Sequence, residues 1–87
     1  MNIKQIKYFV SVANRGSLSS AAREHGISVQ AVSKSMADLE FEFGENLFDR
    51  SHQGIELTPL GEAFLEKAAE VDSSFRELEL CLLYTSP

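Results

Sequence analysis

The stretch that decides the fold is residues 16–44, which read GSLSSAAREHGISVQAVSKSMADLEFEFG. Ser17 and Ser28 each precede a segment with helical apolar spacing, and serine is a favoured N-cap because its hydroxyl oxygen accepts a hydrogen bond from a first-turn amide. Gly26 and Gly44 end the two segments, since glycine readily adopts the left-handed conformation of a helix C-cap. The stretch therefore predicts two helices joined by a short turn, which is a helix-turn-helix.

The apolar positions inside this stretch define one buried side for each helix. They are Leu18, Ala21 and Ala22 in the first helix, and Val32, Met36, Leu39 and Phe43 in the second. The two alanines allow the helices to cross closely and nearly at right angles. His25 extends the first series and is compatible with two positions. Its side chain lies either at the edge of the core or outside it, in solvent beside Glu24 or toward DNA.

The flanking segments complete a winged helix-turn-helix. In residues 3–14 the helical apolar spacing of Ile3, Ile6, Phe9, Val10 and Ala13 predicts a first amphipathic helix. Residues 47–50 and 55–57 predict two short strands around a polar turn, which together form a hairpin wing. Thr58 and Pro59 suit the N-cap and first position of a last helix that runs to about Leu83. The predicted fold class is mainly α, with a three-helix core, a short β-hairpin wing and a long linker helix.

Composition and charge indicate one ordinary small domain. The chain has 87 residues, of which 44% are hydrophobic and 24% are charged. No apolar run approaches the roughly 20 residues of a spanning helix, and the amino terminus has no signal-peptide core, so we expect a cytoplasmic protein without membrane contact. The net charge is −5, but residues 62–87 carry six acidic and two basic groups. Between residues 15 and 37 three basic groups face one acidic group, which predicts a locally positive surface.

Several exposed positions are candidates for contact with double-stranded DNA. The helix after Ser28 presents small, hydrogen-bonding side chains that suit a major groove. The start of the helix after Ser17 and the wing offer contacts to phosphates. The candidate DNA-binding residues are Ser17, Ser19, Ser28, Gln30, Ala31, Ser33, Lys34, Arg50, His52 and Gln53. Each has a plainer interpretation, because serines cap helices, small polar residues cover solvated faces and Arg50 suits an internal salt bridge.

The last helix carries a narrow apolar seam. Its members are Phe64, Ala68, Val71, Phe75, Leu78 and Leu82. Their alternating spacing of four and three residues is typical of a coiled coil, which requires a partner helix. We therefore predict a homodimer that pairs through this helix. The alternative is a helix that folds back over its own domain.

The chain resembles the amino-terminal domain of LysR-type transcriptional regulators over about residues 1–65. The motifs that carry the resemblance are Phe9, residues 16–22 (GSLSSAA), residues 31–34 (AVSK), Leu39-Glu40, Gly44, residues 47–50 (LFDR) and residues 57–61 (LTPLG). The resemblance implies that Ser33 and Lys34 lie in the recognition helix, with Gln30 and Ala31 beside them, and that residues 50–54 form the wing. It also implies a linker helix that pairs two subunits on neighbouring half-sites.

The resemblance sets a domain organisation and marks three departures. Residues 1–58 are expected to form the DNA-binding domain, residues 59–83 the dimerisation helix and residues 84–87 a tail. Residues 81–87 also resemble translated sequencing-adapter text, which leaves a non-native origin open. Val29 stands where the family often has glutamine, Gln53 where many members are basic and His25 where an apolar residue is usual. Whole family members continue into a larger domain that senses a small molecule, so an effector is expected only with such a domain.

Two other function classes were weighed against DNA binding. An enzyme needs converging polar groups, whereas His25, His52 and Cys81 fall on separate predicted elements without metal-ligand spacing. We therefore expect no catalytic residue, cofactor or metal. The stronger alternative is a winged-helix module that binds another protein and not DNA, which the negative charge permits. Salt-dependent binding to duplex DNA distinguishes the two.

Overall fold

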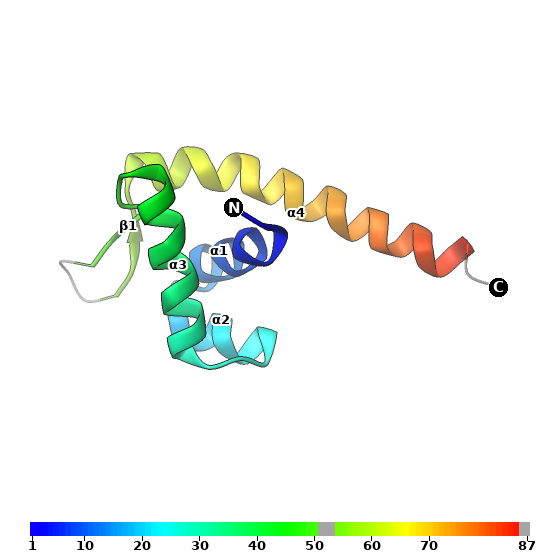
Figure 1. Cartoon of the computed structure of the whole chain (residues 1–87), viewed down its shortest axis with the longest axis horizontal. Coiled ribbons are helices and arrows are strands. Elements are labelled where there is room, and N and C mark those ends of the chain that lie inside the picture. Colours follow the sequence, from blue (N-terminus) through cyan, green and yellow to red (C-terminus); the bar gives the residue numbers. More distant parts are fainter. Residues whose placement is uncertain (51–53, 86–87) are drawn as a thin grey trace.

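The computed structural model describes residues 1–50 and 54–85 of the chain. Its elements in chain order are α1 (Ile3–Arg15), α2 (Leu18–His25), α3 (Val29–Phe43), β1 (Phe48–Asp49), β2 (Glu56–Leu57) and α4 (Pro59–Thr85). The first three helices form a compact unit, and α4 runs across α1 and extends well beyond it (Figure 1). The described part is 51 × 25 × 19 Å along its principal axes. The predicted winged helix-turn-helix with a long last helix is confirmed.

The helices begin at the capping residues that the sequence predicts. The Ser17 hydroxyl accepts a hydrogen bond from the Ser20 amide at 3.2 Å, and the Ser28 hydroxyl accepts one from the Ala31 amide at 3.1 Å. Gly26 ends α2 with a φ of 67° in the left-handed region. A further N-cap was not predicted, because Asn2 and Gln5 at the start of α1 exchange side-chain and backbone hydrogen bonds at 2.9 Å each. This capping box begins α1 firmly at Ile3.

The core is built around α1, which contacts α2, α3 and α4. Phe9 is completely buried, and its ring lies 5.2 Å from that of Phe48 and 4.7 Å from that of Phe64. Val12 is also completely buried, although it lies outside the apolar face predicted for residues 3–14. A helix covered on three sides buries a wider face than an amphipathic stripe predicts. The buried residues are Phe9, Val10, Val12, Ala21, Ala22, Val32, Met36, Leu39, Leu47, Phe48 and Ala68.

His25 lies at the edge of this core. Its side chain is partly buried, and its ring meets that of Tyr8 edge-on, with centroids 4.9 Å apart. The Nε2 atom is buried and makes no hydrogen bond to any described residue. The sequence leaves two positions open for the His25 side chain, and in the structure this side chain lies at the edge of the core.

The hairpin is anchored to α3 and to α4 at its base. Phe48 pairs with Leu57 and Asp49 with Glu56 in antiparallel register. Each strand has two residues and is therefore shorter than predicted. The Glu40 carboxylate accepts hydrogen bonds from the amides of Leu47, at 2.8 Å, and Phe48, at 3.2 Å. An acidic residue near the end of α3 thus satisfies two backbone donors where the first strand begins.

The start of α4 belongs to the same packed unit. Leu60, Phe64 and Leu65 pack against the core, and Ala68 is part of it. The core of the winged-helix unit therefore includes side chains from the first turns of the helix that follows residue 58. Within the described residues no helix is long and apolar enough to cross a membrane.

At Gly61 the backbone of α4 lies against the backbone of Leu47. A Cβ added there would lie 2.1 Å from the carbonyl oxygen of Leu47, which is far inside van der Waals contact. The same carbonyl accepts a hydrogen bond from the Thr58 amide at 3.0 Å, so it is not free to move away. Only glycine allows α4 to lie this near the base of the wing.

We predict that Gly61→Ala destabilises the protein by about 1–3 kcal/mol, because the methyl group meets a fixed carbonyl. Helix propensity alone predicts the opposite, a gain of roughly 1 kcal/mol. Urea denaturation of the two proteins measures the difference. Ser74→Ala, at an exposed position of α4, is the control and should be neutral or slightly stabilising. A Gly61→Ala protein as stable as the parent contradicts the close approach.

Candidate nucleic-acid interface

Helix α3 has one fully buried side and one exposed side. Val32, Met36 and Leu39 have no exposed surface, and they fix the rotation of the helix about its axis. The exposed side begins at the amino-terminal end with Val29, which is 40% exposed, and Gln30. It continues through Ala31, Lys34 and Ala37, with Ser33 partly buried at the margin. Apart from Val29, the side presented to solvent therefore consists of small and polar side chains, and it has no acidic side chain over its first two turns.

Lys34 is the one basic side chain on this part of α3. Its ammonium lies 3.0 Å from the Asp38 carboxylate, and the two side chains are 78% and 52% exposed. A surface pair of this kind contributes little stability, typically 0–1 kcal/mol. The Lys34 ammonium is therefore available to exchange Asp38 for another anion at low cost.

Two of the predicted serines cap helices. The hydroxyl oxygens of Ser17 and Ser28 are the N-cap acceptors of α2 and α3, as described above. Ser19, in the first turn of α2, is exposed. Capping uses the oxygen as an acceptor and leaves the hydroxyl hydrogen for a further acceptor, so the structural and binding interpretations are compatible.

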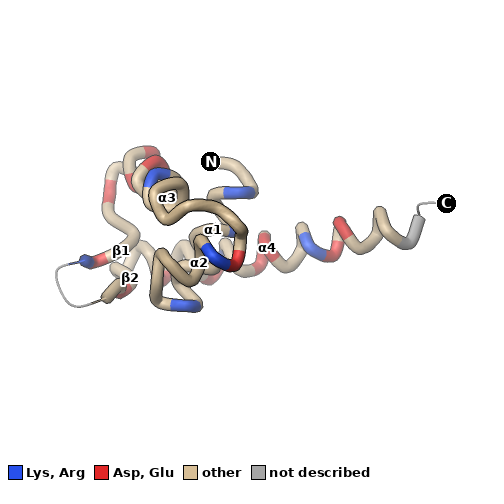
Figure 2. The backbone as a smooth tube through the Cα atoms, turned by 90° about the horizontal axis from the view of Figure 1, so that it is seen from below, with Lys and Arg blue, Asp and Glu red and all other residues tan. Residues whose placement is uncertain are grey.

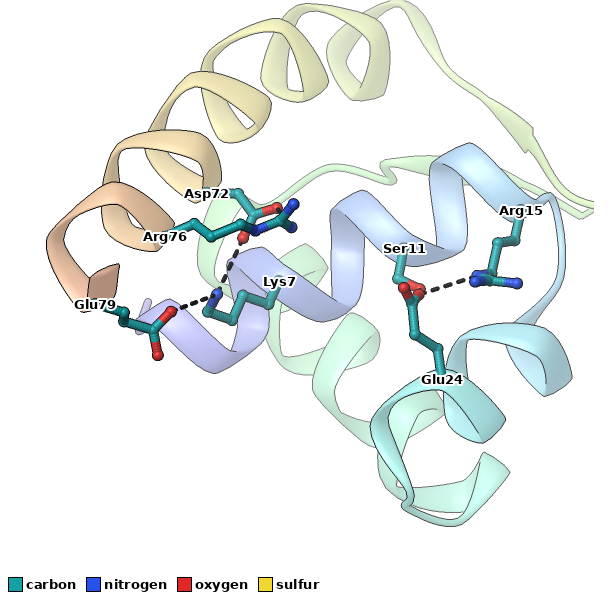
Figure 3. A network of polar contacts seen from close by, with 7 residues as sticks. All are labelled: Lys7, Ser11, Arg15, Glu24, Asp72, Arg76 and Glu79. Carbon is teal, nitrogen blue, oxygen red and sulfur yellow. Dashed lines mark hydrogen bonds and ion pairs between the residues drawn. The ribbon is translucent and has the colours of Figure 1, made fainter. Parts of the chain in front are cut away.

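An ion pair joins α1 to α2. The Arg15 guanidinium donates to the Glu24 carboxylate at 3.0 Å, and the Ser11 hydroxyl donates to the same oxygen (Figure 3). The Ser11 hydrogen bond is the larger cause and the Arg15 hydrogen bond the next, and together they hold the pKa of Glu24 below its ordinary value of 4.5. The one acidic group between residues 15 and 37 is thus neutralised locally.

The wing is only partly described. Arg50 directly follows β1 and is exposed. The other two predicted wing contacts, His52 and Gln53, lie outside the described residues. Figure 2 shows basic and acidic positions close together on α2, α3, the end of β1 and α4, whereas α1 carries basic positions alone.

The predicted dimer seam divides into two environments. Phe64 and Ala68 are taken up by the core of the same chain, because α4 crosses α1 there. Phe75 is partly buried, and the Lys7 ammonium lies 5.1 Å from its ring centroid. The three remaining members are more exposed, at 44% for Val71, 59% for Leu78 and 66% for Leu82. The apolar surface of α4 that is open to a partner helix therefore starts at Val71.

The sequence matches a known family over most of its length. Residues 3–62 match the model of the bacterial regulatory helix-turn-helix proteins of the lysR family. The chain belongs to the LysR family. The match covers α1 to the start of α4, so it includes every element that places the exposed side of α3.

Two relatives show how this LysR-family chain compares with longer proteins. It is 42% identical to the transcriptional regulator TcbR of Pseudomonas sp. strain P51 over 71 residues, which are 82% of this chain and 24% of TcbR. It is 41% identical to BudR of Klebsiella aerogenes over 71 residues, which are 82% of this chain and 50% of BudR. The chain therefore spans between a quarter and a half of these regulators.

Solved structures of LysR-family domains have the same fold. The DNA-binding domain of CbnR, solved in complex with DNA, is 36% identical with a TM-score of 0.81, and the match covers 99% of this chain and 100% of that one. The BenM DNA-binding domain bound to the catB site 1 DNA is 25% identical with a TM-score of 0.87, and the match covers all of both chains. The α4 orientation is thus included in the likeness.

Sequence reasoning missed the polar contacts that hold the helices together. Lys7, Asp72 and Glu79 form one group between α1 and α4, and Ser11, Arg15 and Glu24 form another between α1 and α2 (Figure 3). The two partners of the first pair are 65 positions apart, so no local pattern reveals it. Among residues 1–50 and 54–85 no group of His, Cys, Asp and Glu side chains suits a metal ion.

We predict that Glu24→Gln makes the stability of the protein less sensitive to acid. The depressed pKa of Glu24 means that its contribution is present above the unfolded pKa, near 4.5, and is lost as the pH falls through the folded value. The parent should therefore lose more unfolding free energy than the variant between pH 6 and pH 3. The difference is small, because the Glu24 side chain is 41% exposed. Chemical denaturation at the two pH values measures it, with the exposed Glu66→Gln as control. An equal pH dependence in parent and Glu24→Gln contradicts the interpretation.

Proposed function

We propose that this chain binds double-stranded DNA in a sequence-specific manner to regulate transcription, as a homodimer paired through α4. The observation that carries the proposal is the two-sided α3, whose buried residues fix it in the domain while a narrow polar side faces outward. A helix with small side chains enters a major groove, which is about 12 Å wide, without steric conflict. The LysR-family membership and the likeness to domains solved with DNA support it.

The proposed contacts fall into two classes. Gln30, Ala31 and Ser33 are proposed to face base edges, because amide, methyl and hydroxyl groups discriminate bases in the major groove. Lys34 exchanges Asp38 for a phosphate. The amides and serines at the start of α2, including Ser17 and Ser19, bind a second phosphate, since a helix amino terminus favours anions. The phosphate contacts set affinity and orientation, whereas the base contacts set specificity.

The wing is proposed to contact DNA together with the recognition helix α3. Arg50 is proposed to reach the backbone beside the major groove, with His52 and Gln53 as the further wing contacts that the sequence predicts. Ser28 caps α3, and its hydroxyl is proposed to contact the same duplex. The net charge of the chain does not oppose this arrangement, because the excess of acidic groups is carried by residues 62–87.

The dimer is proposed to form along the outer half of α4. Val71, Leu78 and Leu82 offer a row of exposed apolar side chains beyond the point where the core ends. Two antiparallel or parallel copies would cover this row and hold two recognition helices about one turn of DNA apart. The proposed role is binding and not catalysis, and an effector response would belong to a further domain of a longer protein.

We predict that Ser33→Ala combined with Lys34→Ala abolishes specific DNA binding and leaves the helical signal and the melting temperature nearly unchanged. Neither side chain belongs to the core, so the fold has no reason to change. Loss of the Lys34 phosphate contact alone should reduce the salt dependence of log Kd by about 1. Fluorescence anisotropy over a salt series, with selected and random duplexes, gives both quantities.

The matched control for Lys34 is Lys67→Ala, which removes the same charge from an exposed site on α4. This control should bind the selected duplex as the parent does. If the double variant binds like the parent, α3 does not read the DNA.

We predict that Leu78→Glu produces a monomer. A carboxylate in the centre of an apolar seam must be buried without a partner on dimerisation, which costs several kcal/mol. The 59% exposed Leu78 makes little contact with its own domain, so the monomer should remain folded. Sedimentation equilibrium gives the association state, and Glu77→Gln, one position away, serves as the control. A parent that sediments as a monomer at tens of micromolar would refute the seam.

A further inference from the structure

Lys7 of α1 holds α4 at three successive positions along one side of that helix. Its ammonium lies 3.2 Å from the Asp72 carboxylate and 3.7 Å from that of Glu79 (Figure 3). The same group lies 5.1 Å from the centroid of the Phe75 ring, within cation–π range. These partners span two turns of α4, so one side chain fixes both the rotation of α4 and its tilt against α1.

Asp72 makes this contact unusual, because a carboxylate is rarely buried. It is 8% exposed, and of the described residues it is the most buried charged one. Lys7 and Arg76 both pair with it, Arg76 at 3.2 Å from the same helix. A buried ion pair adds little net stability, because desolvation offsets its attraction, but it is strict about geometry. The pair therefore restricts how α4 docks more than it strengthens the docking.

The contact is placed where a small change of angle has a large effect. The core ends near Ala68, and the seam available to a partner begins at Val71, so Lys7 acts where α4 leaves the domain. From Asp72 to the end of α4 the helix continues for about 20 Å, at about 1.5 Å per residue. A tilt of about 10° at Asp72 displaces that end by roughly 3.5 Å, which is close to the 3.4 Å between base pairs.

We propose that Lys7, through Asp72, Phe75 and Glu79, is a positioning residue that sets the spacing of the two DNA half-sites read by a dimer. Lys7 itself touches no DNA in this role. It fixes the direction of α4 relative to α3, and the pairing of two α4 helices converts that direction into a distance between recognition helices. The inference rests on the proposed function, that is, on DNA binding by a dimer paired through α4.

The test is a spacing profile. The half-site is first selected from random duplexes with the parent chain, and two copies are then placed at every centre-to-centre spacing across one helical turn. The parent should prefer one spacing. Lys7→Gln should lose about fivefold or more in affinity at that spacing but less at the neighbouring spacings, so its profile broadens. Its dimer constant and its half-site sequence should stay close to those of the parent. Its melting temperature should fall, because Asp72 stays buried with Arg76 as its remaining ion-pair partner, so binding is measured at a temperature where the variant is folded. Lys7→Arg, which keeps the charge toward Asp72 and Glu79, should restore the narrow profile.

Two further variants separate this role from a loss of folding. Glu79 is 55% exposed, so Glu79→Gln removes one of the three contacts without disturbing the core, and a partial broadening is expected. Glu77→Gln, on the same turn of α4, should leave the profile unchanged. If Lys7→Gln and Glu79→Gln both keep the spacing profile of the parent, Lys7 does not set the spacing. That result overturns the role of Lys7 and leaves the proposed dimer unaffected. A parent that binds DNA with no spacing preference overturns the paired dimer, and the role of Lys7 with it.

Discussion

The burial of α1 on three sides is the constraint on which the rest of the structure depends. Phe9 lies at its centre, where the ring meets Phe48 from the wing and Phe64 from α4. One aromatic side chain thus connects the base of the hairpin and the linker helix to the helix-turn-helix. Because α2 and α3 also pack on α1, the position of every element proposed to face DNA is set from this one helix.

Local rules were enough to predict the elements and their order. The serine caps and the glycines after α2 and α3 define helix ends through backbone chemistry that involves only a few neighbouring residues. The position of Ser33 and Lys34 off the core follows equally from helical spacing. Val12 and Phe64 could not be assigned in the same way, because their burial depends on which helix lies above them. Spacing shows that α4 has an apolar stripe, but only the packed structure shows that its first part faces inward.

For charged residues too, a contact within one helix can be predicted from the sequence, whereas a contact between distant segments cannot. The Lys34 and Asp38 pair is four residues apart on one helix, so its geometry is implied by the sequence. Glu40 instead binds backbone amides that follow the end of its helix, and Asp72 binds a lysine from the other end of the chain. The net charge of −5 reflects neither arrangement. The carboxylates near α2 and α3 are paired, so the distribution of charge on that surface differs from the one on α4. Net charge is therefore a weak guide to partners in a chain this small.

The contact between Leu47 and the start of α4 has a mechanical consequence. Thr58 alone separates β2 from Pro59, its amide is hydrogen-bonded to the Leu47 carbonyl, and Gly61 allows the helix to rest against that carbonyl. The hairpin base and the first turn of α4 therefore move as one rigid lever with no hinge between them. In the proposed complex, a force that a bound duplex applies to the wing would be transmitted to α4, the helix proposed to pair with the second subunit. Bending of the duplex would then be coupled mechanically to strain between the subunits.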